Sequence, residues 1–430
     1  MDASRDGTGE DMRRRIRAIL VGSSGNLVEY YDFYVYAAFS LYFAKSFFPA
    51  GDQTAQLLAS AGIFAVGFLM RPLGAWGFGR LADRQGRRIA LTSSVLLMCI
   101  GSAMIALTPT YESIGVAAPI ILLVARLIQG LSLGGEYGTS ATYLSEMATE
   151  KRRGFYSSFQ YVTLIGGQLS AMLVLIVLQK LVLTEQQLVD WGWRIPFVIG
   201  ALLAVVAYRM RRDMHETEAF TRSTRRNSSL RTLLEHPREI AIVVGLTMGG
   251  TVAFYTYTTY MQKFLVNTSG FAKDTATLIS ASALFLYMLM QPVVGALSDK
   301  VGRRPVLIAF GVLGTLTTVP ILTALQETRD PIIAFLLILT GLTIVSGYTS
   351  INAVVKAELF PTHVRALGVG LPFAITVALF GGTAEYIGLW LKKMGNETAF
   401  YWYITGCIAV SLVVYAGMRD TRDTSKIDRT

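Results

Sequence analysis

Long apolar segments recur through the 430-residue chain and constrain its fold more than any other feature. A helix needs about 20 mostly apolar residues to cross about 30 Å of hydrocarbon. Twelve such segments occur, which predicts an all-α membrane protein with twelve transmembrane helices. The segments lie near residues 18–42, 57–79, 89–108, 118–143, 155–178, 193–210, 239–263, 276–297, 305–325, 331–355, 368–391 and 399–418.

The composition agrees with a chain that is dissolved largely in lipid. It is 52% hydrophobic and 16% charged, whereas soluble domains carry about 25% charged residues. The two cysteines, Cys99 and Cys407, lie in apolar segments far apart in the sequence. We therefore expect neither a disulfide framework nor a metal site. The three histidines lie in polar connections, so the predicted segments have no histidine to relay protons.

Lys and Arg are concentrated in every second connection between the predicted segments. Because positive residues favour the cytoplasmic side, both termini and the long central connection are predicted to face the cytoplasm of a bacterial inner membrane. The net charge of +10 results from this excess of Lys and Arg on the predicted cytoplasmic side. It does not indicate a nucleic-acid surface, because no basic stripe with interleaved aromatic residues lies outside the membrane ends. The opposite connections hold few positive residues, among them Lys180, Lys263 and Lys273.

A ten-residue motif occurs twice. Residues 79–88 read GRLADRQGRR and residues 295–304 read GALSDKVGRR, each after the second segment of its half. In the next cytoplasmic connection of each half, a glutamate precedes an arginine by seven residues. Such repeats predict two six-helix bundles around a pseudo-twofold axis along the membrane normal. The predicted organisation is an N-terminal bundle over 1–210, a cytoplasmic linker over 211–238, a C-terminal bundle over 239–418 and a cytoplasmic tail over 419–430.

The repeated loops resemble the signature of the major facilitator superfamily. Three further stretches are similar to its metabolite–proton symporter branch: GNLVEYYDF at 25–33, FLMRPLG at 68–74 and RLIQGLSLGGEYG at 126–138. Within that branch the chain resembles carriers of α-ketoglutarate over almost its whole length. The resemblance implies the major facilitator fold. It also implies a secondary active transporter that imports α-ketoglutarate, or a closely related dicarboxylate, with protons by alternating access.

Other functions stay open on the sequence alone. A citrate, shikimate or osmolyte proton symporter would have the same fold, although osmolyte carriers resemble this chain less. A membrane receptor would need a signalling domain, for which the central connection and the tail leave no room. An enzyme is the least expected class, because no Ser-His-Asp, metal or nucleotide constellation is present.

The resemblance also implies the partners. They are a small anionic substrate, a proton and a lipid bilayer, with no nucleic acid. We expect a monomer without a cofactor, in which the proton gradient supplies the energy.

Charged residues inside the predicted segments mark the candidate substrate site, because charges at membrane depth usually face a bundle interior or an aqueous cavity. Arg71 and Arg126 are the leading ligands, since a guanidinium offers paired donors that match a carboxylate. The alternative for both is a latch, in which they neutralise Asp32 and Glu136. Polar residues on helical stripes complete the predicted substrate-binding set. They are Asn26, Tyr36, Gln160, Tyr161, Gln168, Tyr255, Asn352 and Lys356.

Carboxylates are the candidates for proton coupling. No histidine lies in the predicted segments, and a carboxyl group can gain and lose a proton as its surroundings change. Asp32 and Glu136 are the first candidates, and Glu29 and Glu385 are the second. The alternative role for Glu385 is a fixed interhelical hydrogen bond.

The repeated motifs place acids and bases together at the cytoplasmic ends of the helices. We predict that they form salt-bridge latches, which close the inner mouth when the site faces outward. Positive-inside topology alone is the alternative, but it does not account for acids that recur at fixed spacing. The predicted gate residues are Asp83, Arg87, Arg88, Glu146 and Arg153 in the first half, and Asp299, Arg303, Arg304, Glu358 and Arg365 in the second.

Overall fold

A computed structural model describes residues 27–85, 87–135, 137–212, 230–361 and 364–427, and within these ranges the chain is helical without strands. Among the described residues, nine helices are long and apolar enough to cross a membrane, and Thr92–Leu107 and Gly192–Val206 are shorter apolar helices. With the helix over residues 27–47, they match the twelve predicted segments one to one. The predicted fold class is therefore confirmed.

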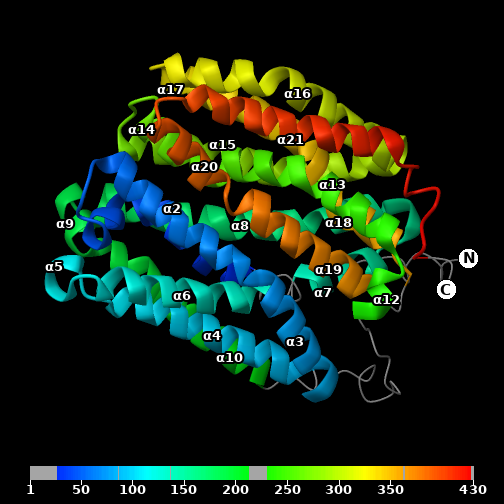
Figure 1. The fold of residues 1–430 in the computed structure, drawn as a ribbon, viewed down its shortest axis with the longest axis horizontal. Coiled ribbons are helices and arrows are strands. Elements are labelled where there is room, and N and C mark those ends of the chain that lie inside the picture. Colours follow the sequence, from blue (N-terminus) through cyan, green and yellow to red (C-terminus); the bar gives the residue numbers. More distant parts are fainter. Residues whose placement is uncertain (1–26, 86, 136, 213–229, 362–363, 428–430) are drawn as a thin grey trace, which may run out of the picture.

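The helices before residue 212 pack mainly on one another. Helix α6 lies against α2, α3 and α4, and α4 lies against α10 (Figure 1). Their bounds are α2 Gln53–Leu69, α3 Arg71–Gln85, α4 Arg87–Leu107, α5 Tyr111–Ile114, α6 Ala117–Gly134, α7 Tyr137–Met147, α8 Arg153–Val177, α9 Glu185–Asp190 and α10 Ile195–Arg212.

The later helices form a second group, in which α16 packs on α17 and α21, and α13 packs on α21. Figure 1 shows α16, α17 and α21 along one side of the molecule and α4, α6 and α10 along the other. The bounds are α12 Leu230–Leu234, α13 Pro237–Tyr255, α14 Met261–Asn267, α15 Lys273–Val301, α16 Arg303–Glu327, α17 Pro331–Thr349, α18 Asn352–Leu359, α19 Arg365–Thr376, α20 Ala384–Lys393 and α21 Glu397–Gly417.

The two groups meet along α8 with α15, α2 with α20, and α7 with α19. Glycines permit the close approach of helices here and within the first group. A Cβ added at Gly130 would overlap the carbonyl oxygen of Gly67, and one added at Gly138 would lie 2.7 Å from the carbonyl oxygen of Ala366. Small residues of this kind let membrane helices pack backbone against backbone.

The molecule has two ends, at which different elements lie. We call the end at which α12 and residues 418–427 lie the motif end, because the second repeated motif is found there; the opposite end carries α5 and α9 (Figure 1). Lys263 corrects a prediction from sequence. It was assigned to a connection, but it lies in α14 inside the span Pro237–Asn267 and is buried.

Candidate functional site

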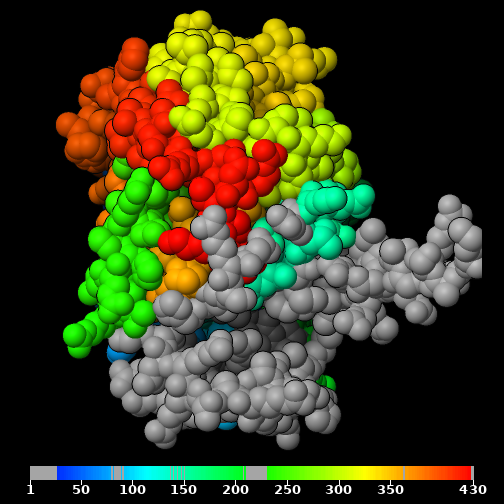
Figure 2. All heavy atoms as spheres, turned by 90° about the vertical axis from the view of Figure 1, so that its right-hand side faces the viewer, coloured from blue at the N-terminus to red at the C-terminus, as the bar shows by residue number. Residues whose placement is uncertain are grey.

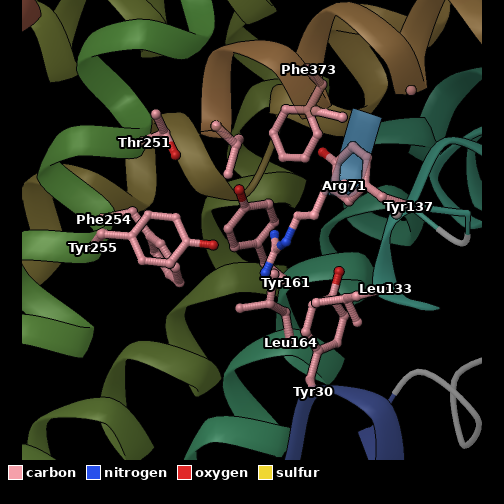
Figure 3. A pocket seen from close by; sticks show the side chains of 14 residues that line it. Tyr30, Arg71, Leu133, Tyr137, Tyr161, Leu164, Thr251, Phe254, Tyr255 and Phe373 are labelled. Carbon is pink, nitrogen blue, oxygen red and sulfur yellow. The ribbon is translucent and has the colours of Figure 1, made fainter. Parts of the chain in front are cut away.

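A cavity lies between the two groups of helices. Its walls are mainly aromatic and apolar, and Arg71 is the charged residue among the described residues that line it (Figure 3). The lining residues are Tyr30, Arg71, Leu133, Gly134, Tyr137, Tyr161, Leu164, Thr251, Phe254, Tyr255, Gly370, Phe373, Ala374 and Val377. Pockets of this kind, apolar with a few polar groups, are the usual form of a small-molecule site.

Arg71 begins α3 and extends into the cavity (Figure 3). Its guanidinium carbon lies 4.4 Å from the centre of the Phe33 ring and 3.9 Å from that of the Phe68 ring. The buried Nε and Nη2 atoms have no hydrogen-bond partner in the described part of the chain. Burying such a charge without a counter-ion is costly. Within the described residues, these donors are therefore available to an anionic group.

Arg126 lies outside the cavity lining and is fully buried. Its Nη1 donates to Gln129 Oε1 at 2.7 Å, and Gln129 Nε2 donates to Asp32 Oδ2 at 2.9 Å. The Ser102 hydroxyl donates to the other oxygen of Asp32. Sequence reasoning missed Gln129 and Ser102 because their roles depend on contacts between helices. The structure thus links Arg126 to Asp32 through Gln129, whereas no direct ion pair joins the two residues.

Two candidate carboxylates lie elsewhere in the fold. Glu29 is buried on the same helix as Asp32. Glu385 in α20 forms a buried ion pair with Lys263 in α14, at 2.5 Å. This contact joins two helices of the second group, so its geometry fits the fixed interhelical role that was the alternative for Glu385. Asn26 and Glu136 lie outside the described residues.

Lys356 in α18 is a second buried cation near the cavity. Its Nζ donates to the Tyr137 hydroxyl at 2.8 Å and lies 3.6 Å from the centre of the Phe373 ring. Within the ranges that the structure covers, it forms no ion pair. Tyr137 of α7 stacks on Phe373 of α19, with ring centres 3.8 Å apart, and also donates to Asn352 Oδ1 at 2.8 Å. Tyr137 and Phe373 line the cavity, and Lys356 lies behind them.

The other predicted substrate-binding residues divide into two sets. Tyr161 and Tyr255 line the cavity, as the helical stripes predict. Gln160 accepts a hydrogen bond from Ser140, and Tyr36 donates to the carbonyl oxygen of Ser60. Gln160, Tyr36 and Gln168 are buried but do not line the cavity.

The predicted gate residues of the second half meet the first half at the motif end. Asp299 accepts hydrogen bonds from the backbone N–H groups of Gly154 and Phe155, at 2.8 and 2.9 Å, and pairs with Arg303 at 2.8 Å. Arg303 also pairs with Glu358 at 3.5 Å. These contacts close the motif end along α8 and α15.

A second contact at the motif end joins Arg365 of α19 to Glu146 of α7, at 2.5 Å. Arg304 differs from the prediction, because it donates to the carbonyl oxygens of Tyr415 and Ala416 in its own half. Its contacts therefore do not join the halves. The side chains of Asp83, Arg87 and Arg88, in α3 and α4, lie outside the described part.

Ion pairs also join the two halves at the opposite end. Lys180 pairs with Asp274 at 2.5 Å, and Lys273 pairs with Glu185 at 3.0 Å. Each pair joins the first half to the second. The cavity therefore lies between two closed ends.

The fold and the enclosed central cavity are those of a membrane transporter. The family model of the major facilitator superfamily matches residues 23–371 and 254–427, so the chain belongs to this superfamily. It is 56% identical to the alpha-ketoglutarate permease of Escherichia coli K12, over 95% of this chain and 94% of that protein. It is 36% identical to the citrate-proton symporter of Klebsiella pneumoniae, over 90% of this chain and 88% of that protein.

Solved structures agree on the fold. The proton:xylose symporter XylE, bound to 6-bromo-6-deoxy-D-glucose, aligns with a TM-score of 0.73 over 97% of this chain and 98% of that chain, at 19% sequence identity. The relatives named here are permeases and symporters rather than enzymes.

Proposed function

We propose that this transporter is a symporter that imports α-ketoglutarate, or a closely related dicarboxylate, together with protons. The 56% identity to the E. coli permease supports the substrate class. The structural observation that carries the proposal is the buried Arg71 guanidinium, which faces the cavity and has no counter-ion among the described residues. The proton gradient supplies the energy, and no cofactor takes part.

The proposed setting is the bacterial inner membrane, with the chain acting as a monomer. The motif end and both termini face the cytoplasm. The two bundles over 1–210 and 239–418, joined by the linker 211–238, rock about the cavity. The gate residues at the motif end close its inner side.

The charges around the cavity favour a dianion. Arg71 comes from the first half and Lys356 from the second, and neither pairs with a carboxylate of the described residues. Lys263, by contrast, forms an ion pair with Glu385. A dicarboxylate can supply one negative charge to each half, to Arg71 in the cavity and to Lys356 once the aromatic rings that cover it move apart. A monocarboxylate can neutralise only one of the two cations.

The second carboxylate of the substrate can reach Lys356 when two aromatic rings that cover it move apart. The stacked rings of Tyr137 and Phe373 stand between the Lys356 ammonium and the cavity. These rings come from different halves, so they part when the halves separate at the motif end. We expect Lys356 then to meet the substrate as it leaves.

Asp32 is the proposed proton site. Its two oxygens accept hydrogen bonds from Ser102 and Gln129, and Gln129 accepts one from Arg126. Protonation of the carboxylate removes its negative charge and one acceptor, so the link to Arg126 weakens. These contacts support the latch alternative for Arg126, whereas Arg71 is the proposed substrate ligand. Phe33 follows Asp32 in sequence and contacts both guanidinium groups, at 4.4 Å for Arg71 and 4.3 Å for Arg126, which connects the proton site to the substrate site.

Uptake into proteoliposomes tests the transport proposal. Labelled α-ketoglutarate should accumulate when the outside is acidic relative to the lumen. Citrate, succinate, shikimate and betaine serve as competitors. Equal accumulation under a sodium gradient alone would refute proton coupling, and stronger competition by citrate than by unlabelled α-ketoglutarate would favour a citrate carrier.

Binding measurements test the two-cation site. Lys356→Gln should weaken α-ketoglutarate binding by about 2 kcal/mol, roughly 30-fold, because one desolvated carboxylate loses its partner. A monocarboxylate such as butyrate should lose much less. Arg71→Lys should weaken both ligands, since the ammonium cannot reproduce the paired donors. Equal losses for both ligands in Lys356→Gln would contradict the second subsite. Lys300→Gln, an exposed lysine at the motif end, is the control.

A further inference from the structure

The segment 418–427, predicted only as a tail, crosses the motif end. Figure 2 looks onto this end and shows the segment in red between the green helices and the yellow-green ones, beside residues near 150 (Figure 2). Thr421 and Ser425 on this segment are buried. We propose that residues 419–427 form a strap that holds the motif end closed and so controls access to the cavity from that side.

Three residues anchor the strap to the second half. The Asp420 carboxylate accepts hydrogen bonds from the N–H groups of Arg303 and Arg304, at 3.2 and 3.1 Å, where α16 begins. Carboxylates at a helix N-terminus satisfy N–H groups that lack intrahelical partners. Lys426 Nζ donates to Glu239 Oε1 at 2.7 Å. Arg422 donates to the carbonyl oxygens of residues 299 and 300.

The strap also binds the residues that close the gate. Thr421 Oγ1 donates to Glu358 Oε2 at 2.6 Å, and the N–H of Lys426 donates to the Glu358 carbonyl oxygen at 3.0 Å. Arg365 Nη2 donates to the Lys426 carbonyl oxygen at 3.1 Å. Arg153, from the first half, donates to Ser425 Oγ at 3.4 Å. The strap thus reaches both halves.

These contacts orient the side chains on which closure depends. Glu358 forms an ion pair with Arg303, and Arg303 forms one with Asp299. The Asp299 carboxylate in turn accepts hydrogen bonds from the backbone N–H groups of Gly154 and Phe155. Arg365 holds Glu146 of the first half. With the strap in place, Glu358 and Arg365 are fixed in the closed arrangement before the halves meet. Removing the strap leaves these buried groups with fewer partners and favours opening.

The inference rests on the proposed alternating access but not on the identity of the substrate. Hydrogen exchange of the substrate-free protein therefore tests it separately. The N–H groups of Gly154 and Phe155 are the probes, because they lie in the first turn of α8 and bond to Asp299. Their exchange reports opening of the motif end.

Three variants define the test. The first ends the chain at Met418. The second, Thr421→Val with Ser425→Ala, keeps the strap but removes two gate contacts. Asp423→Asn is the matched control, since Asp423 is exposed and pairs only with its neighbour Arg422 among the described residues. We expect exchange at Gly154 and Phe155 to become roughly 10- to 30-fold faster in the truncated chain and several-fold faster in the double variant. The control and the peptide over 180–190 at the opposite end should stay within about twofold.

Two results would contradict the proposal that residues 419–427 hold the motif end closed. One is unchanged exchange at Gly154 and Phe155 in the double variant and the truncated chain. The other is an equal increase at both ends, because that would indicate general loss of stability rather than release of one gate. If the truncated chain does not fold, the double variant alone decides. A failure to transport α-ketoglutarate would leave these measurements unaffected.

Discussion

The two ends of the molecule are closed by different means. At the motif end, the side chains of Arg303 and Asp299 are 1% and 7% exposed, and Asp299 also binds two backbone N–H groups. At the opposite end, the paired side chains of Lys180 and Asp274 are 44% and 40% exposed. Exposed ion pairs contribute about 0–1 kcal/mol, whereas hydrogen bonds to buried charged groups contribute about 1.5–3 kcal/mol each.

The difference predicts which way the empty transporter faces. Separation at the opposite end breaks weak, hydrated pairs, while separation at the motif end strips partners from buried charges. We therefore expect the opposite end to open more readily. If the motif end faces the cytoplasm, the resting carrier is open to the outside, where an importer collects its substrate.

The largest expected effect follows from Asp299→Ala. This variant removes the acceptor for Gly154 and Phe155 and leaves Arg303 without one of its carboxylates. Loss of one partner of a buried pair costs about 3–5 kcal/mol, and we expect the population to move toward an open motif end. Spin labels at positions 152 and 300, in a background without Cys99 and Cys407, should report longer distances.

Substrate binding by the Asp299→Ala variant in detergent should stay within about threefold of wild type, because Asp299 does not line the cavity. Uptake should fall by at least an order of magnitude. Binding that fell as far as uptake would contradict the assignment of Asp299 to the gate. Labels at 186 and 329 should report shorter distances, because alternating access closes the opposite end when the motif end opens.

A smaller effect is expected from Arg365→Gln. Arg365 pairs with Glu146, but the Glu146 side chain is 40% exposed and can be rehydrated when the pair is lost. We expect opening of the motif end to become easier by about 2 kcal/mol, with the same pair of labels as the measurement.

Arg304→Gln is the matched control for this variant. Arg304 is another predicted gate residue, but within the described chain its side chain bonds only to backbone carbonyl oxygens of α21 in its own half. If Arg304→Gln opened the motif end as far as Arg365→Gln, the basic residues would act through net charge rather than through contacts between the halves.

Much of this architecture was predictable from sequence. Twelve apolar segments gave the helices, because hydrocarbon thickness sets their length. The repeated motif marked Asp299, Arg303 and Glu358 as acids and bases that meet at one end, and the structure brings them together. Periodicity in the segments also placed Tyr161 and Tyr255 at the cavity. These features are local in the chain, so spacing and residue type reveal them.

The remaining features depend on partners far away in the chain. Lys263 stands at the boundary of a predicted segment and is counted with the connection that follows, and only the contact with Glu385, 122 residues later, shows it to be buried. Tyr137 and Phe373 are ordinary aromatic residues in apolar segments until α7 and α19 meet. The strap residues Thr421 and Ser425 form a short polar tail in sequence. Their roles come from tertiary packing, which periodicity does not encode.

The smallest expected effect is at the opposite end. Asp274→Asn removes the ion pair with Lys180 but leaves the pair between Lys273 and Glu185. Because both partners of the lost pair are exposed, we expect opening at this end to become at most about fivefold more frequent, equivalent to up to about 1 kcal/mol. Raising the salt concentration to about 0.5 M should produce a similar change in the wild type and little further change in the variant, because ions screen exposed pairs. The distance between spin labels at 186 and 329 measures the effect of the substitution and the effect of salt. A shift as large as that of Asp299→Ala would mean that the two ends are closed with equal strength, and the predicted preference for an outward-facing resting state would fail.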